Sequence, residues 1–125
     1  MKNKKLNLNI NNTPKYQLNR NSTDGKNCIL KFSMCHEKYP LWDLNKEELK
    51  EFIRFAKKVE NLEWKDIKKD KGLRYEELNN YEKPDNVSKD VTIRSMRLSQ
   101  KSRIIGYRQD EFFYIIWFDN NHETC

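Results

Sequence analysis

The sequence predicts an α+β domain, and three observations support that prediction. Apolar and polar residues alternate over residues 28–34, which is typical of a strand with one buried face. Between residues 46 and 69 the apolar residues recur at helical spacing. From residue 91 onward the period returns to two. This order predicts one N-terminal strand, two or three helices and a three-stranded antiparallel meander packed on the helices.

The first helix has a recognisable start. Asn45 can cap it, and Glu48 three residues later can complete a capping box. The face packed on the core is predicted from the apolar residues at helical spacing: Leu49, Phe52, Ile53, Ala56 and Val59. A second, shorter helix is expected over 62–69, because Gly72 interrupts the pattern. Residues 73–81 are compatible with one further helical turn.

The meander begins with "VTIRSMRLS". Its apolar residues change phase between Ile93 and Met96, so we expect a β-bulge near Arg94–Ser95. Residues 103–108 ("RIIGYR") form the next expected strand. Residues 112–118 ("FFYIIWF") form the last one. This strand is apolar on both faces, so we expect it to be central, covered by helices on one side and by another layer on the other.

Basic charge gathers in two parts of the chain. The 125 residues suit one domain, with residues 1–27 as a flexible, Asn- and Lys-rich arm and residues 28–125 as the folded unit. The net charge is +6, and residues 1–28 carry six bases and one acid. Within 91–110, five bases stand against the single acid Asp110. Such a cluster suits a phosphate backbone, and an ordinary solvated strand face explains it equally well.

The cysteines and the hydropathy narrow the class of protein. An odd number of cysteines, three, without a secretion signal argues against a disulfide framework. No apolar run approaches the roughly 20 residues that cross a bilayer. We therefore expect a cytoplasmic protein without membrane contact, metal or cofactor. A zinc site is a minor alternative whose scattered donors lack a short Cys-Cys pair: Cys28, Cys35, His36, His122 and Cys125.

A polar stretch, Asp119–Glu123, directly follows the apolar last strand. In a meander, its histidine and the arginines of neighbouring strands can converge at one end of the sheet. Cleavage of RNA by its own 2′-hydroxyl needs a base, an acid and fixed cations around the phosphate. Histidine suits proton transfer near neutral pH, and the planar guanidinium of arginine suits phosphate oxygens.

Two segments carry a family resemblance. "RLSQKSRIIGY" and "FFYIIWFDNNHE" resemble the C-terminal half of the RelE/ParE superfamily of toxins, especially the branch with YoeB and HigB. The resemblance covers roughly residues 29–125 and is close in the last thirty. It implies the toxin of a type II toxin–antitoxin system, held by a cognate antitoxin. It also implies an endoribonuclease, an mRNA interferase that cuts mRNA on the ribosome without a metal.

The resemblance implies roles for individual residues. Arg103 matches the phosphate-stabilising arginine, and His122 matches the C-terminal histidine that acts as general acid. The acidic base is expected near the end of the helical region, where Glu76 and Glu77 are the candidates and Glu77 is selected. Contacts with RNA are expected from the basic and aromatic residues of the meander: Arg94, Arg97, Lys101, Tyr107 and Arg108.

The sequence also departs from the family pattern. Glu123-Thr124-Cys125 stands where a terminal tyrosine often follows the histidine, and the N-terminal arm is long. ParE-like members share the fold but inhibit a DNA topoisomerase, so a non-nucleolytic toxin or a non-catalytic binding domain stays open. Charge complementarity predicts that the antitoxin lies along the helical face or over the basic groove.

Overall fold

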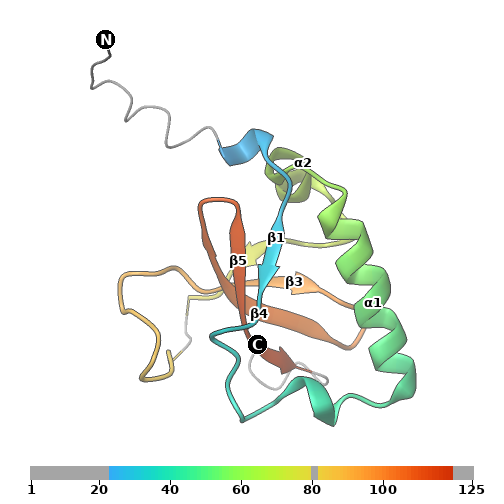
Figure 1. Ribbon diagram of the computed structural model, residues 1–125, viewed down its shortest axis with the longest axis vertical. Coiled ribbons are helices and arrows are strands. Elements are labelled where there is room, and N and C mark those ends of the chain that lie inside the picture. The colour runs from blue at the N-terminus through green and yellow to red at the C-terminus, as the bar shows by residue number, and fades with distance from the viewer. Residues whose placement is uncertain (1–22, 80–81, 120–125) are drawn as a thin grey trace.

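The computed structural model describes residues 23–79 and 82–119. Two helices pack on one face of a five-stranded sheet, so the predicted α+β class is confirmed (Figure 1). The elements are β1 (Ile29–Lys31), α1 (Lys46–Glu60), α2 (Trp64–Lys69), β2 (Glu76–Glu77), β3 (Arg94–Arg97), β4 (Arg103–Gln109) and β5 (Phe112–Asp119). Neither helix in this part of the chain is long and apolar enough to span a bilayer.

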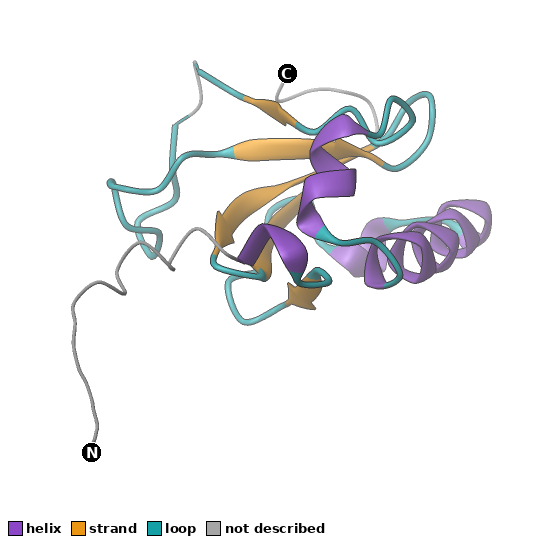
Figure 2. Ribbon diagram, turned by 90° about the horizontal axis from the view of Figure 1, so that it is seen from above, coloured by secondary structure: helices purple, strands orange, loops and turns teal. Residues whose placement is uncertain are grey.

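The strand order is β1-β5-β4-β3-β2. The last three long strands form the predicted antiparallel meander, and β5 lies between β4 and β1 (Figure 1). Figure 2 shows the helices in purple beside the strands in orange. β1 runs parallel to β5, which requires a crossover connection of the kind that the helical segment provides. β2 extends the other edge by two residues and pairs antiparallel with β3.

α1 begins at the predicted capping box. The Glu48 backbone N–H donates to Asn45 Oδ1, and the Asn45 N–H donates to Glu48 Oε1, both at 2.8 Å. The predicted buried face is confirmed at Phe52 and Val59, and Phe55 is buried in addition. Leu49 and Ile53 remain 40% and 51% exposed. The two phenylalanines turn the helix so that their large rings, rather than the smaller aliphatic side chains, reach the sheet.

The segment after α2 is not a third helix in its described part. Arg74 has a positive φ of 47°, and the chain then runs extended along β3. The Arg97 N–H donates to the Leu73 carbonyl, and the Leu78 N–H donates to the Ile93 carbonyl. The backbone hydrogen bonds of this segment are therefore satisfied by the sheet instead of by a helix.

The bulge lies elsewhere than predicted. The β3–β4 register is continuous from Arg94 to Arg97, so the bulge expected at Arg94–Ser95 is wrong. The register shifts instead between β4 and β5, at Ile105/Gly106. A Cβ at Gly106 would overlap the Tyr114 carbonyl oxygen, so glycine permits this close approach.

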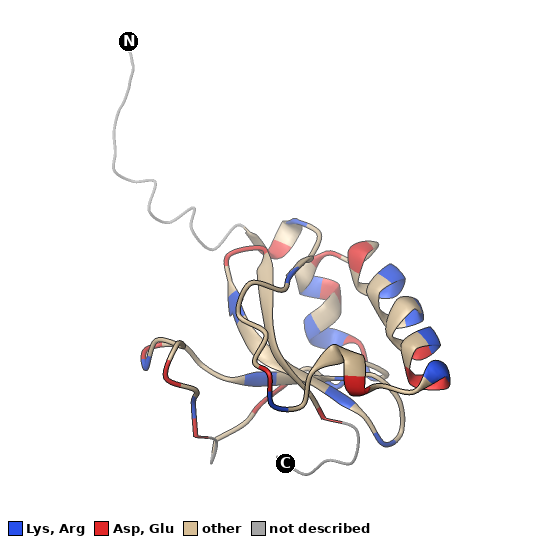
Figure 3. Ribbon diagram, turned by 60° about the horizontal axis from the view of Figure 1, so that its bottom comes forward, with Lys and Arg blue, Asp and Glu red and all other residues tan. Residues whose placement is uncertain are grey.

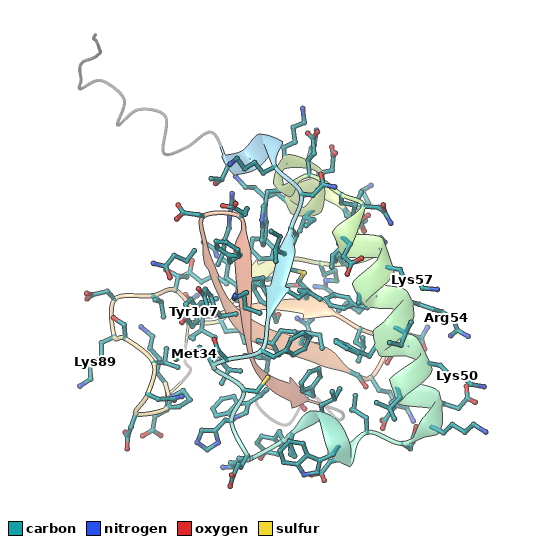
Figure 4. The ribbon with its side chains drawn as sticks, in the orientation of Figure 1. Met34, Lys50, Arg54, Lys57, Lys89 and Tyr107 are labelled. Atoms are coloured by element: carbon teal, nitrogen blue, oxygen red, sulfur yellow. The ribbon has the colours of Figure 1, made fainter. Side chains whose placement is uncertain are left out.

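The sheet is buried on both faces, which explains the phase change in the sequence. We call the side that packs on α1 and α2 the helix face; its sheet residues include Met96, Ile104, Phe113, Ile115 and Phe118. The opposite side, the loop face, is covered by the segments before η3 (Leu41–Asp43) and before β3. Its core comprises Ile93, Ile105, Tyr107, Ile116 and Trp117, with Met34, Tyr39 and Val87 (Figure 4). Ile93 and Met96 therefore point to opposite faces without a bulge.

Residues 23–27 contact the domain. The Trp64 N–H donates to the Lys26 carbonyl, and Asn27 Nδ2 donates to the Glu60 carbonyl at 2.9 Å. The boundary predicted after residue 27 therefore falls inside a segment that packs on α2. The remainder of the expected arm, residues 1–22, lies outside the described residues.

Candidate functional site

Arg103 begins β4 on the loop face, because side chains alternate and Ile105 and Tyr107 belong to that face. The register places Arg97 of β3 opposite it on one side and Asp119 of β5 on the other. These three side chains form one row across the sheet. Arg103 is 7% exposed and Asp119 is 1% exposed, so the row carries ionisable groups that are unusually buried.

The neighbouring row fixes the Arg103 guanidinium. Arg103 Nη1 donates to Ser95 Oγ at 2.6 Å, and Nη2 lies 3.8 Å from Glu76 Oε2. The same Glu76 oxygen lies closer, at 3.0 Å, to Arg74 Nε. Ser95 is therefore the tighter anchor, and Glu76 is shared between two arginines. We call Glu76, Ser95, Arg97, Arg103 and Asp119 the Arg103 cluster.

Two donors of this cluster have no acceptor among the described residues. The Nε groups of Arg97 and Arg103 are buried, and neither has a hydrogen-bond partner among the residues that the structure describes. A buried donor without an acceptor costs about 1–3 kcal/mol. An oxyanion that approached both guanidiniums would supply the acceptors, and charge-assisted bonds of this kind are the strong ones.

The carboxylate at the cluster is not the one selected from the sequence. Glu77 pairs with Arg94 in the register, and its side chain belongs to the opposite face from that of Glu76. Glu76 is the residue that reaches Arg103. A two-residue strand could not be located from the sequence, so the alternation that separates these neighbours was missed. Ser95 was missed for the same reason, since its role depends on the β3–β4 register.

Two further candidates for RNA contacts, Lys101 and Tyr107, differ in how far their side chains are exposed to solvent. Lys101 is exposed in the β3–β4 connection, and its backbone N–H donates to Ser99 Oγ at 3.3 Å. Tyr107 is 7% exposed and stacks on Tyr114 with ring centroids 5.1 Å apart. Burial raises the pKa of the Tyr107 hydroxyl. Tyr107 is thus part of the core and does not present an open ring to an RNA base.

Arg94 and Arg108 lie apart from the Arg103 cluster. The Arg94 guanidinium carbon is 5.2 Å from the ring centroid of Tyr75, and that of Arg108 is 4.3 Å from Trp64. Both rings belong to the helix-face core. The structure therefore does not gather the basic residues of the meander on one surface, and basic positions occur on helices and strands alike (Figure 3).

His122 lies outside the described residues. The histidine that the structure does describe near the loop face is His36. Its ring meets Trp117 edge to face, with centroids 6.0 Å apart, and its Nδ1 accepts from the Lys38 N–H at 3.1 Å. The His36 backbone N–H donates to the Ile116 carbonyl. These residues are far apart in the sequence, so no local sequence pattern predicts this contact. The sequence had suggested His36 only as a zinc donor.

The described residues contain no group of three His, Cys, Asp or Glu side chains placed to hold a metal ion. Burial raises the pKa of the Cys28 thiol to about 12, and it also raises that of Cys35. Thiols bind metals as thiolates, so both residues are poorly suited as ligands. His122 and Cys125, the other proposed donors, lie beyond the described residues.

Comparisons with known proteins give one structural similarity. No family model matches the sequence, and no curated protein matches it either. A similar solved structure is the crystal structure of an archaeal RelE–RelB complex from Pyrococcus horikoshii. It aligns with a TM-score of 0.46 and 15% sequence identity, over 78% of this chain and 97% of that chain. A similarity at this level does not by itself assign a family or an activity.

Proposed function

We propose that this protein is the toxin of a toxin–antitoxin pair and that it cleaves mRNA on the ribosome. The sequence resemblance to the RelE/ParE superfamily motivates the reaction class. The observation that carries the proposal is the Arg103 guanidinium. It is held by Ser95 and lies opposite Arg97, and each of these two arginines has a buried Nε that lacks an acceptor among the described residues.

A phosphate oxygen is the acceptor that fits these donors. As the 2′-oxygen attacks phosphorus, the phosphate gains negative charge in the transition state. Donors that are already oriented stabilise that charge without having to reorganise. Ser95 holds Nη1 of the Arg103 guanidinium, while its buried Nε has no acceptor among the described residues. Arg103 then stabilises the phosphorane, while Arg97 and the exposed Lys101 hold the flanking backbone.

Two groups serve the proton transfers in this proposal. Glu76, whose carboxylate lies 3.8 Å from Arg103, replaces Glu77 as the base that takes the 2′-hydroxyl proton. His122 donates a proton to the departing 5′-oxygen, and a 2′,3′-cyclic phosphate remains. His122 follows Asp119 of the Arg103 cluster by three positions in the sequence, and three residues of chain span at most about 11 Å.

The partners follow from the same proposal. A ribosomal target places the activity in the cytoplasm, and an antitoxin with acidic side chains would neutralise the toxin by occupying the Arg103 cluster. RNA and antitoxin would then compete for one surface. Simultaneous, independent binding of both would contradict this part of the proposal.

The test is primer extension on an mRNA that is being translated in a cell-free extract. Purified wild type should produce new cuts at A-site codons, and Arg103→Ala and His122→Ala should each lose them by about 100-fold or more. Lys57→Ala is the matched control, because Lys57 projects outward from α1, on the other side of the sheet (Figure 4). It removes one positive charge without touching the Arg103 cluster.

Two other results would redirect the assignment. If the message stays intact while expression of the protein still arrests growth with signs of DNA damage, the ParE-like inhibition of a topoisomerase replaces the nuclease. If cleavage disappears in Arg103→Ala but persists in His122→Ala, the general acid is another residue, and His36 beside Trp117 becomes the one to substitute next.

A further inference from the structure

The helix face carries a cavity that the proposed reaction does not use. Its volume is about 630 Å³, within the range of small-ligand sites. Three bases from three separate elements line it: Lys68 of α2, Arg94 of β3 and Arg108 of β4. The rest of the lining comes from one acid, Asp90, and from Tyr75, Val91, Thr92 and Gln109.

We propose that this cavity is a second phosphate-binding site, separate from the Arg103 cluster. The shared chemistry of its ligand is a phosphate group, supplied either by a free nucleotide or by the backbone of RNA. Arg94 and Arg103 belong to opposite faces of the sheet, so one phosphate cannot contact both. The inference therefore goes beyond the proposed nuclease and does not depend on it.

Both guanidiniums are held in place before any ligand arrives. Arg108 lies 4.3 Å from the Trp64 ring centroid, and its Nε donates to the Asp110 carbonyl at 2.7 Å. Arg94 lies 5.2 Å from the Tyr75 ring centroid. A guanidinium that already rests on an aromatic ring loses less conformational freedom on binding, so more of the interaction energy appears as affinity.

The existing ion pairs show that the site accepts an oxyanion. The Asp24 carboxylate bridges two of the three bases, with one oxygen 2.6 Å from Lys68 Nζ and the other 2.8 Å from Arg108 Nη2. The hydrogen bonds from Lys68 and then Arg108 lower the pKa of Asp24. Arg94 has no ion pair within the described part of the chain, so it is the base left to bind a further anion.

The net charge of the site favours a phosphate. Among the residues that line the cavity, three bases face one acid, Asp90. Asp24 offsets part of this charge through Lys68 and Arg108. Glu77 lies opposite Arg94 in the β2–β3 register, and the described residues show no ion pair between the two. A phosphate monoester carries up to two negative charges and has several acceptor oxygens. Its oxygens would take the fork of Arg94, while the Thr92 hydroxyl and the Gln109 amide, both at the cavity wall, supply neutral donors.

The experiment follows the arginine Nε–Hε signals of the full chain by NMR during titration with inorganic phosphate. The Arg94 signal should shift and saturate in wild type. Followed on the Arg108 signal, which the variant keeps, Arg94→Gln should weaken phosphate binding by about tenfold, as expected for one lost charge-assisted contact. Lys57→Gln is the matched control and should leave binding unchanged. Arg103→Ala should also retain it, which separates this site from the proposed nuclease.

Two further probes identify the source of the phosphate. Adenosine 5′-monophosphate represents a free nucleotide, and oligouridine with hydroxyl ends represents RNA backbone. Saturation by the nucleotide alone assigns a small ligand, and displacement of phosphate by the oligonucleotide assigns RNA. A shift of Arg94 that grows linearly without saturation overturns the site. So does an affinity for phosphate that is the same in Arg94→Gln and wild type, with an unchanged backbone spectrum in both.

Discussion

Arg103 and Arg108 lie five residues apart in β4 and have opposite surroundings. Arg108 contacts the Trp64 ring, donates to the Asp110 carbonyl and to Thr23 Oγ1, and pairs with Asp24 at 2.8 Å. Every one of these contacts stabilises the fold, since they join the N-terminal segment, α2 and the β4–β5 turn. Arg108 is therefore mainly a structural residue that also borders a cavity.

Arg103 is more buried yet less satisfied. Its guanidinium donates to Ser95, and the carboxylate that lies 3.8 Å away is nearer to Arg74. Its Nε has no acceptor among the described residues. A buried guanidinium with a spare donor is a costly arrangement for stability alone. The difference between the two arginines shows that partners, rather than burial or residue type, separate a structural cation from one available to a ligand.

The largest expected effect comes from Gly106, which lies between the two arginines at the register shift. Gly106→Ala places a Cβ on the Tyr114 carbonyl oxygen, and backbone cannot yield as a flexible side chain does. We expect a loss of about 3 kcal/mol in the free energy of unfolding, measured by urea denaturation. Gly25→Ala is the control, because nothing lies within 4 Å of a Cβ at that position. Equal stability of both variants would contradict the close approach.

The next effect concerns Glu76 and rests on the proposed function. Glu76→Gln keeps the shape of the side chain but removes the base and the negative charge beside Arg103. We expect ribosome-dependent cleavage to fall by about 100-fold, while RNA affinity rises by at most about fivefold. Glu77→Gln, on the opposite face, should change neither quantity. A loss of cleavage in Glu77→Gln alone would restore the base that the sequence suggested.

The order of the helices and strands was predictable because it depends on local sequence patterns. The capping box at Asn45 and the period-two segments of the meander each depend on residues close in sequence. The rotation of α1 was not predictable, since Phe55 is buried by contacts with distant residues. The short strand β2 was missed because two residues carry no periodicity, and its pairing with β3 is a tertiary effect.

Several residues of the candidate site could be predicted from the sequence, but their arrangement in space could not. Arg97 and Arg103 were expected to act together, and the register places them opposite each other. The separation of Arg94 and Arg108 onto the helix face follows from alternation along β3 and β4, which the sequence already contained. The error was to treat basic residues near in sequence as one surface. The role of His122 stays a prediction.

A smaller effect tests the comparison of the two arginines directly. Methionine has a similar length but no charge, so Arg108→Met removes three hydrogen bonds, one of which is the ion pair with Asp24, and a cation–π contact. We expect a loss of about 2 kcal/mol in the free energy of unfolding. Arg103→Met should lose less than about 1 kcal/mol, because it also removes an unsatisfied buried donor. The reverse order in thermal or urea unfolding would refute the distinction.

The smallest effect is the pH dependence of the Asp24 contact. Its hydrogen bonds with Lys68 and Arg108 hold the folded-state pKa below the ordinary value of 3.8, while the unfolded chain has that ordinary value. The stabilisation is therefore fully present above about pH 4 and is lost as the pH falls through the lower, folded-state pKa. The ion pair is partly exposed, so solvent screening limits its contribution to the free energy of unfolding to under about 1 kcal/mol.

The gap in unfolding free energy between wild type and Asp24→Asn should be constant from pH 7 to 5 and shrink in more acidic buffer. Asp85→Asn, at an exposed position, is the control for the loss of one carboxylate and should leave the free energy of unfolding unchanged at pH 7. A wild-type advantage that persists at the lowest pH would mean that Asp24 acts through packing rather than charge, and Arg108 would then owe its position chiefly to the Trp64 ring.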